Sequence, residues 1–204
     1  MVKVEDKSVP RRERTRMRIH NNILTAAKAG IGRAGIHGIT MNEIAIEADV
    51  SRATLFKYFP SKNDIVAAVA DEMQQGFFAL IDRCILRSDD PAERVRLVFV
   101  TTATALENSS TLSKQFVAIS FLSLNRPAVP PAVEHFDGAF RKMLSTGQLA
   151  GSPTLDLVTD FAAGIFVGLL YRWLTLDPFP LRQRMIAAAE EVAELIARRT
   201  KEGA

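Results

Sequence analysis

The fold of the N-terminal part of the chain is decided by one stretch, residues 39–64, which reads ITMNEIAIEADVSRATLFKYFPSKND. This stretch predicts two short helices joined by a tight turn, followed by the start of a third helix. Thr40 and Glu43 have the spacing of a capping box, so we expect the first helix to begin directly after Thr40. Apolar residues then recur at helical spacing on one face of that helix: Met41, Ile44, Ala45 and Ala48.

The turn and the second helix follow at residues 48–59. Asp49 lies in the turn, and Asp tolerates the left-handed backbone conformation that a tight turn often needs. Ser51 is expected to cap the second helix. Leu55 and Phe59 are expected to form its buried face, and we expect Phe56 to be a core residue rather than a base-stacking one.

Two helices joined by a short turn are the plan of a helix-turn-helix, in which the second helix lies in the major groove of DNA. The second helix here contains basic and hydroxyl-bearing residues and no acid. Because Arg is the commonest reader of guanine and Ala can contact only a thymine methyl, we assign base contacts to Arg52, Ala53 and Lys57. The geometry alone leaves a simpler alternative, a pair of short helices in an all-α domain.

The stretch resembles the DNA-binding domain of the TetR/AcrR family of transcriptional regulators, and the resemblance covers about residues 16–66. That family's pattern has a capped helix containing Ile-Ala, an Ala-Gly-Val turn, a Ser followed by a small residue and Thr, and a Phe before Ser-Lys. Two residues depart from it, since Asp49 stands where Gly is usual and Ala53 where Gly is frequent. The matching residues are Ala26-Ala27, Gly35-Ile36-His37-Gly38, Thr40, Ile44-Ala45, Ala48, Val50-Ser51, Thr54-Leu55-Phe56, Tyr58-Phe59 and Ser61-Lys62.

The resemblance implies a protein that binds a double-stranded DNA operator as a homodimer and is released by a small-molecule effector. It also implies phosphate contacts by Thr40, Thr54, Tyr58 and Lys62. Together with the base contacts and the capping serine, the predicted DNA-binding residues are Thr40, Ser51, Arg52, Ala53, Thr54, Lys57, Tyr58 and Lys62.

Positive charge is concentrated at the N-terminal end. Residues 1–62 contain 12 Lys and Arg against 6 Asp and Glu, whereas residues 63–204 contain 14 against 17. This asymmetry is expected if the N-terminal end meets phosphates, although a basic arm also suits an anionic membrane or solubility. Residues 1–10 are polar and lack periodicity, which predicts a mobile arm before the first helix.

The compartment is predicted from the cysteine content and the apolar runs. The single cysteine, Cys84, excludes an intrachain disulfide and fits a reducing cytosol. The N-terminus lacks the apolar core of a signal peptide, and the longest uncharged apolar run, residues 161–171, is shorter than the roughly 20 residues that span a bilayer. We therefore expect a cytoplasmic protein without a membrane partner.

The whole chain is predicted to be all-α, because no segment shows the alternation typical of a strand. About nine helices are expected. An N-terminal arm and a three-helix helix-turn-helix DNA-binding domain would occupy residues 1–62, and a helical effector-binding and dimerisation domain residues 63–204. A long helix from Ser61 to about Arg87 would span both domains, and a proline-rich break is expected at residues 126–131.

The last two helices are expected at about residues 154–174 and 181–199. The first of them is apolar almost all round, so it must bury one face on its own core and the other elsewhere. Gly164 and Gly168, four residues apart, would allow another helix to approach closely. Two such helices from each chain can form a four-helix bundle with a symmetry mate, as the family resemblance implies, and the alternative is that both are core helices of a monomer.

An effector pocket is implied by the resemblance and is supported by large apolar side chains after residue 63. For any single one of these residues, a role in the core is the simpler alternative. The predicted effector-binding residues are Phe77, Phe99, Phe116, Phe121, His135, Phe136, Phe140, Phe166 and Trp173.

Two other function classes are alternatives to a ligand-responsive repressor. One is a constitutive or architectural DNA-binding protein without an effector. The other is a helical enzyme, for which the sequence offers no metal-ligand spacing among His20, His37 and His135, no HExxH motif and no glycine-rich phosphate loop. We therefore expect a ligand-responsive repressor that is not an enzyme and that needs no metal or cofactor.

Overall fold

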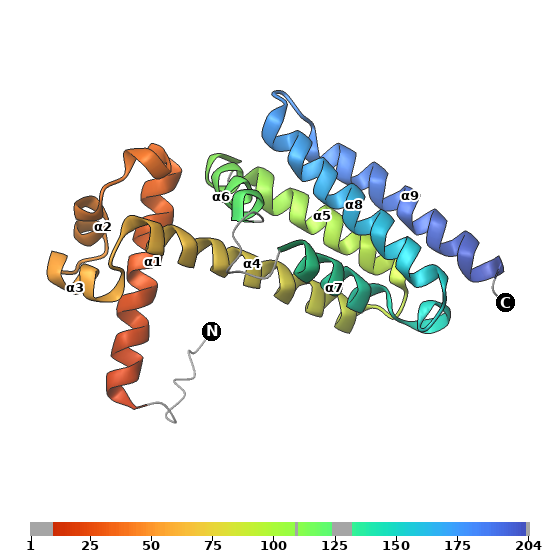
Figure 1. Cartoon of the computed structure of the whole chain (residues 1–204), viewed down its shortest axis with the longest axis horizontal. Helices are drawn as coiled ribbons and strands as arrows, with labels where there is room; N and C mark the ends of the chain where they lie inside the picture. The colour runs from red at the N-terminus through yellow and green to blue at the C-terminus, as the bar shows by residue number, and fades with distance from the viewer. Residues whose placement is uncertain (1–9, 109, 124–131, 203–204) are drawn as a thin grey trace. The chain divides into compact units, whose positions relative to one another are not determined.

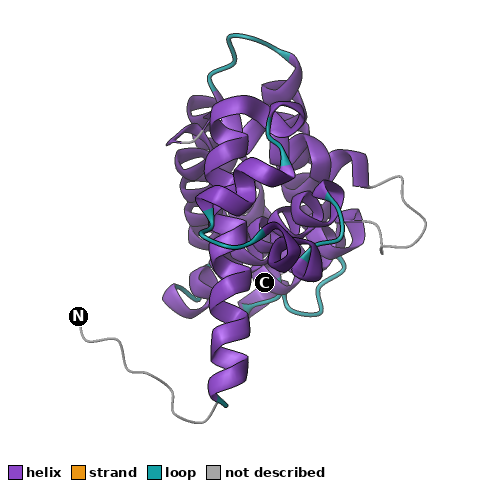
Figure 2. Ribbon diagram, turned by 90° about the vertical axis from the view of Figure 1, so that its left-hand side faces the viewer, coloured by secondary structure: helices purple, strands orange, loops and turns teal. Residues whose placement is uncertain are grey.

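The computed structural model describes residues 10–108, 110–123 and 132–202. In these ranges it contains nine α-helices and one 3-10 turn, Gly147–Leu149, and no strand, which confirms the predicted all-α fold (Figure 1 and Figure 2). Most of the expected N-terminal arm and the whole proline-rich break at residues 126–131 lie outside the described residues. The helices are α1 Arg11–Gly38, α2 Met41–Glu47, α3 Arg52–Tyr58, α4 Lys62–Arg87, α5 Pro91–Asn108, α6 Ser110–Ser123, α7 Ala132–Leu144, α8 Thr154–Thr175 and α9 Leu181–Glu202.

The chain forms two compact units, Met1–Asp71 and Glu72–Ala204. The division falls inside α4, whereas the sequence placed the domain boundary between residues 62 and 63. The helix α4 therefore begins in the first unit and ends in the second.

The first unit is built on α1, against which α2 packs. The helical backbone of α1 is interrupted at Gly35, whose φ of 75° is a left-handed value that favours glycine. A Cβ atom on Gly30 would lie 1.9 Å from the Cδ1 atom of Ile39, so a larger residue there would displace the Ile39 side chain from its present position. The core of this unit includes Ile23, Leu24, Ala27, Ile31, Ile39, Ile44, Leu55, Phe59, Ile65, Val66 and Val69.

The second unit is a helical bundle in which α9 packs against α5 and α8, and α7 packs against α8 (Figure 1). Arg94, near the start of α5, is 4% exposed and contacts the ends of α4 and α7. Its guanidinium donates hydrogen bonds to the carbonyl oxygens of Ile85 and Ser88 at the end of α4 and of Met143 at the end of α7. The buried charge is tolerated there because backbone acceptors satisfy its N–H groups and the carboxylate of Asp89 lies 3.7 Å away.

Among the described residues, α8 is the one helix that is long and apolar enough to cross a membrane, with a mean hydropathy of 1.5 over its best window. It packs on α7 and α9, and side chains such as Val158, Ala162 and Phe166 are buried in the core of the second unit. A core helix of a water-soluble bundle has the same length and composition, so this helix is weak evidence for a membrane.

Candidate nucleic-acid interface

The helix α2 begins with the predicted capping box. The hydroxyl oxygen of Thr40 accepts a hydrogen bond from the backbone N–H of Glu43 at 3.2 Å, and the Glu43 carboxylate accepts one from the backbone N–H of Thr40 at 2.8 Å. The Thr40 hydroxyl also donates to this carboxylate. These bonds lower the pKa of Glu43 below its usual value, because they favour its charged form.

The turn between α2 and α3 has the expected backbone. Asp49 adopts a φ of 54°, and it is the one residue other than glycine with a positive φ among those described. Ser51 then caps α3, since its hydroxyl oxygen accepts a hydrogen bond from the backbone N–H of Thr54 at 3.1 Å. Leu55 and Phe59 are 0% and 4% exposed, so they fix the inward face of α3 as predicted.

The outward face of α3 consists of Arg52, Ala53, Phe56 and Lys57, all of which are exposed. These residues are spaced by three or four along the helix and therefore lie on one side of it. The guanidinium carbon of Arg52 lies 5.6 Å from the centroid of the Phe56 ring, within the range of a cation–π contact. This face offers a bidentate donor, a flat apolar ring, a methyl group and an ammonium group, which are the groups that read base edges in a major groove.

Phe56 corrects the sequence interpretation, which assigned it to the core with Phe59. Its side chain is 39% exposed, and it shares the outward face with Arg52. The signal for this was present in the sequence, because a helix that buries Leu55 and Phe59 turns the residue after Leu55 toward solvent.

The four predicted phosphate-binding residues are in the first unit, and three of them are also part of its framework. Thr40 caps α2, and the hydroxyl groups of Thr54 and Ser51 lie 2.8 Å apart at the start of α3. The ammonium group of Lys62 donates to the carbonyl oxygens of Ile39 at 3.1 Å and His37 at 3.4 Å, so it closes the end of α1. Tyr58 is half-buried. Their contacts with DNA stay a prediction.

A second basic surface lies along the first turns of α1. The side chains of Arg11, Arg12, Arg14, Arg16 and Arg18 are exposed, and a surface hollow of about 580 Å³ is lined by Arg12, Glu13, Arg16, Met17, His20 and Asn21. The His20 ring packs on the ring of Phe59 with centroids 5.0 Å apart. His20, which lines this hollow, therefore packs on the residue that closes α3.

One ion pair links α1 to the end of α2. The guanidinium of Arg33 donates to both carboxylate oxygens of Glu47. These bonds raise the pKa of Arg33 and lower the pKa of Glu47. The pair therefore joins the last turns of α1 to the end of α2.

Aromatic side chains form a packed cluster inside the second unit. The ring of Phe166 lies 5.2 Å from Phe99 and 5.4 Å from both Phe77 and Phe140, measured between centroids. Phe136 packs on Phe77 at 4.9 Å. Phe99, Phe140 and Phe166 are fully buried, whereas Phe77 and Phe136 are half-buried at its edge.

The remaining predicted effector residues are dispersed around this cluster. Phe116 and Trp173 are buried, and the ammonium group of Lys114 lies 5.6 Å from the centroid of the Trp173 ring. Phe121 and His135 are in α6 and α7, and their side chains lie outside the described part of the structure.

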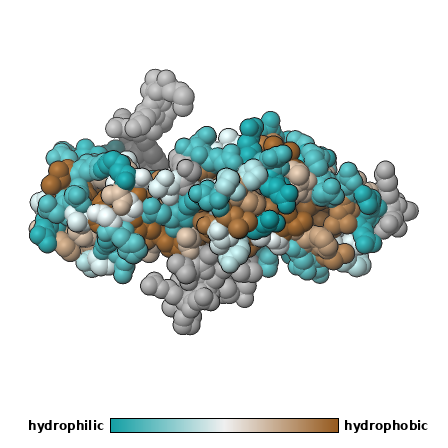
Figure 3. Space-filling model, turned by 90° about the horizontal axis from the view of Figure 1, so that it is seen from above, coloured by the Kyte–Doolittle hydropathy of each residue, from teal (hydrophilic) through white to brown (hydrophobic). Residues whose placement is uncertain are grey.

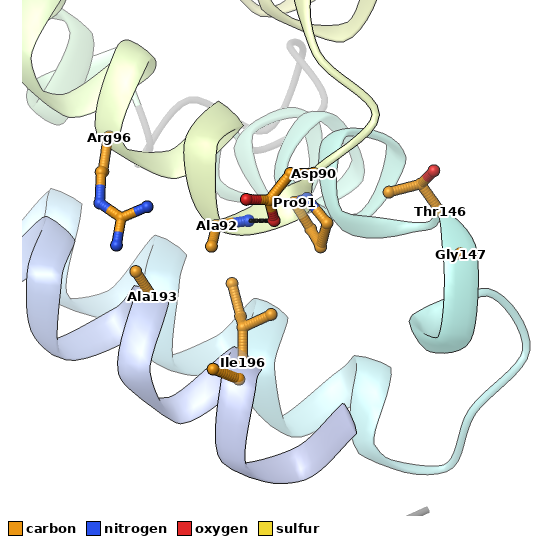
Figure 4. A pocket seen from close by; sticks show the side chains of 9 residues that line it. Asp90, Pro91, Ala92, Arg96, Thr146, Gly147, Ala193 and Ile196 are labelled. Carbon is orange, nitrogen blue, oxygen red and sulfur yellow. Dashed lines mark hydrogen bonds between the residues drawn. The ribbon is translucent and has the colours of Figure 1, made fainter. Parts of the chain in front are cut away.

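A surface hollow of about 360 Å³ in the second unit lies between the start of α5, the turn at Thr146 and α9 (Figure 4). None of the predicted effector residues lines it. The guanidinium of Arg96, on its wall, already donates to the Glu190 carboxylate at 2.9 Å, and Asp90 caps α5 by accepting from the backbone N–H of Ala92. No group of three or more His, Cys, Asp and Glu side chains that could hold a metal occurs in the described ranges.

Known proteins resemble this chain in sequence and in fold. Residues 23–69 match the model of the family described as bacterial regulatory proteins, tetR family. The HTH-type transcriptional repressor KstR of Mycolicibacterium smegmatis is 25% identical over 155 residues, which is 75% of each chain.

Two solved structures share the fold. The transcriptional regulator FadR from Bacillus subtilis, in complex with stearoyl-CoA, has a TM-score of 0.63 and 20% identity, with 87% of this chain and 97% of that chain covered. The multidrug binding protein EbrR, complexed with ethidium, has a TM-score of 0.62 and 20% identity, with 88% and 96% covered.

Proposed function

Since the chain belongs to the TetR family of transcriptional regulators, we propose that it is a ligand-responsive repressor that binds a pseudo-palindromic operator as a homodimer. A small apolar or amphipathic effector would release it from DNA in the cytoplasm. The observation that carries the proposal is the outward face of α3, where Arg52, Phe56 and Lys57 are exposed together without an acidic neighbour on that helix.

We assign the contacts that recognise DNA bases to Arg52, Ala53, Phe56 and Lys57. The Arg52 guanidinium can bind the O6 and N7 atoms of guanine, and the ring of Phe56 can contact a thymine methyl. Phosphate contacts by Thr40, Thr54, Tyr58 and Lys62 would fix the register of α3 in the groove without reading sequence.

We assign the interface of the homodimer to α8 and α9. Apolar side chains remain exposed on both helices, with Leu157 41%, Phe161 50% and Ile186 40% exposed. In a two-fold dimer the two α3 helices would enter successive major grooves about 34–36 Å apart, which is why the operator is expected to be a pseudo-palindrome.

We assign the effector-binding site to the aromatic cluster of the second unit. The comparison proteins FadR and EbrR are described with stearoyl-CoA and ethidium, two ligands with large apolar parts. Phe77 and Phe136 are the half-buried rings at the edge of the cluster, so they are the rings that an apolar ligand could displace first.

The signal would pass through α4. This helix carries Phe77 in the aromatic cluster, and it begins at Lys62, directly after the turn that follows α3. A ligand that binds one orientation of α4 more tightly than the other would change the separation of the two recognition helices. The effector can act only through this difference in affinity.

The proposal is tested by titrating operator DNA with the purified protein in the presence and absence of lauroyl-CoA, stearoyl-CoA and ethidium. We expect at least one of them to bind and to weaken operator binding about tenfold or more, which is the usual range of a coupling free energy. A ligand that binds tightly but leaves the operator affinity unchanged would contradict the release mechanism.

One observation favours the second candidate, a DNA-binding protein without an effector. The rings of Phe99, Phe140 and Phe166 pack on one another as in an ordinary core, with centroid distances of 5.2–6.3 Å. This candidate predicts sequence-specific DNA binding that no apolar ligand alters, so the same titration separates the two functions.

A further inference from the structure

One hydroxyl group in the second unit is buried without a hydrogen-bond partner. Of the buried side-chain nitrogen and oxygen atoms in the described ranges, the Oγ1 atom of Thr102 is the one that lacks a partner. Thr102 lies on α5, three residues after Phe99 and four before Leu106, and both of these residues are buried. Residues at these spacings share one face of a helix, so the side chain of Thr102 faces the core with them.

The unpaired state of this hydroxyl is unusual for the chain. A threonine inside a helix has an acceptor within reach, the carbonyl oxygen four residues earlier. Other helical threonines donate to that carbonyl at 2.8–3.0 Å, whereas Thr102 does not donate to Val98. Because an unpaired buried polar group destabilises a folded protein and is rare, the Thr102 hydroxyl calls for a partner from outside the chain. The threonines that make the local bond are Thr15, Thr104, Thr159 and Thr175.

The aromatic cluster begins one helical turn before Thr102. The ring of Phe99 lies 5.2 Å from that of Phe166 and 6.3 Å from that of Phe140, measured between centroids. The cluster reaches the surface at the half-buried rings of Phe77 and Phe136, and apolar residues are visible among hydrophilic ones on the surface in Figure 3. Apolar walls with one or a few polar groups are the usual composition of a small-molecule site.

We propose that the Thr102 hydroxyl is the hydrogen-bond donor of the effector site, and that the effector is an apolar molecule with a neutral acceptor oxygen, as in a ketone, an ester or a thioester. This inference rests on the proposed effector-binding site and names the chemistry that the site selects. A neutral acceptor fits better than a carboxylate, because burial of a charge beside one hydroxyl donor costs far more than one hydrogen bond returns.

The test compares two probes of the same shape, benzophenone and diphenylmethane. Both have two phenyl rings, and they differ only in the group between the rings, which is a carbonyl in one and a methylene in the other. Equilibrium dialysis of the full chain against each probe measures the two dissociation constants. We expect benzophenone to bind about fivefold more tightly, which is the usual gain from one hydrogen bond.

Three variants assign this preference to one hydroxyl. Thr102→Val removes the hydroxyl at nearly constant size and is expected to abolish the preference, and Thr102→Ser keeps the hydroxyl and the preference. Thr104→Val is the matched control on the same helix, because the Thr104 hydroxyl already donates to the carbonyl oxygen of Val100 at 2.8 Å. This control should bind both probes as the wild type does.

Thermal unfolding without a probe tests the premise. Thr102→Val is expected to raise the Tm by about 2–4 °C, because it removes an unpaired buried hydroxyl. A lower Tm in this variant would show that the hydroxyl is already paired in the folded chain, and it would overturn the proposal.

The binding outcomes separate the effector site from its donor. If neither probe binds at its solubility limit, the effector site in the aromatic cluster and the role of Thr102 are overturned together. If both probes bind with equal constants, or if the preference for benzophenone persists in Thr102→Val, the role of Thr102 alone is overturned. Loss of the preference in Thr102→Val, with its retention in Thr102→Ser and Thr104→Val, is the result that the proposal predicts.

Discussion

The guanidinium carbon of Arg52 lies 5.6 Å from the centroid of the Phe56 ring, on the outward face of α3. The two residues are four apart, so the helix itself brings them together. The ring provides a flat support for the guanidinium, which limits the positions that this long side chain can take. In a major groove, a restrained guanidinium loses less conformational entropy when it binds a base.

Phe56→Ala is therefore expected to weaken operator binding about tenfold, through loss of the ring contact and of the support for Arg52. It should change the free energy of unfolding by only about 1 kcal/mol, because the side chain is 39% exposed. Phe59→Ala is the control, since Phe59 is 4% exposed and its truncation should cost about 3–5 kcal/mol. Urea denaturation and DNA-binding isotherms measure both quantities, and equal loss of stability in the two variants would contradict the assignment.

Lys57 and Lys62 are expected to differ in what their removal does. Lys57 is exposed on α3, whereas the Lys62 ammonium binds the carbonyl oxygens of Ile39 and His37. Lys57→Ala should weaken DNA binding without loss of stability. Lys62→Ala should also lower the free energy of unfolding by about 1–2 kcal/mol, since hydrogen bonds from a charged group are lost.

The salt dependence of DNA binding then tests the phosphate contact of Lys62. If its ammonium meets a phosphate, the slope of log K against log salt concentration should fall by about 0.9 in Lys62→Ala. An unchanged slope, together with the loss of stability, would mean that Lys62 only closes the end of α1.

Acid is expected to weaken the first unit through Glu43 and Glu47. The pKa of Glu43 is lowered by hydrogen bonds from Thr40, and the pKa of Glu47 by hydrogen bonds from Arg33. A carboxyl group with a lowered folded-state pKa adds stability that is fully present above its unfolded pKa, about 4.3, and is lost as pH falls through the folded value. Thermal unfolding of the full chain should therefore show a shallower acid dependence in Glu43→Gln/Glu47→Gln than in the wild type. The same steepness in both would show that other carboxyl groups dominate.

Arg94 is expected to be a major contributor to the stability of the second unit. Arg94→Ala leaves buried carbonyl oxygens without their donor, and we expect the free energy of unfolding to fall by about 3 kcal/mol or more. Arg96→Ala is the matched control on the same helix, because the side chain of Arg96 is only half-buried where it pairs with the exposed Glu190, and its loss should cost less than about 1 kcal/mol. If Arg94→Ala and Arg96→Ala lower the free energy of unfolding equally in urea denaturation, the hydrogen bonds of Arg94 do not have the stabilising role assigned to them.

The sequence predicted the elements that rest on local chemistry. The Thr40–Glu43 capping box, the left-handed Asp49 and the Ser51 cap each depend on residues within a few positions of one another, and each is present. The predicted burial of Phe56 is wrong, because its position on the helix, directly after the buried Leu55, decides its exposure and its apolar character does not.

The contacts that sequence could not predict join distant segments. Lys62 meets the end of α1 only because the first unit folds the chain back on itself, and Arg94 binds Met143, which is 49 residues away. The phenylalanines were also recognised as a group, but only the fold decides that Phe99 and Phe166 are fully buried while Phe77 lies at the edge.

The central claim is that two copies of α3 read a specific DNA sequence. Selection of bound sequences from a random double-stranded library by the purified full chain, followed by sequencing, tests it most directly. We predict a pseudo-palindrome with half-sites about one helical turn apart, and loss of preference at one or more base pairs of each half-site in Arg52→Ala. A library that shows no enriched sequence with the wild-type chain would contradict the claim, and an unchanged profile with Arg52→Ala would contradict the assignment of base reading to this residue.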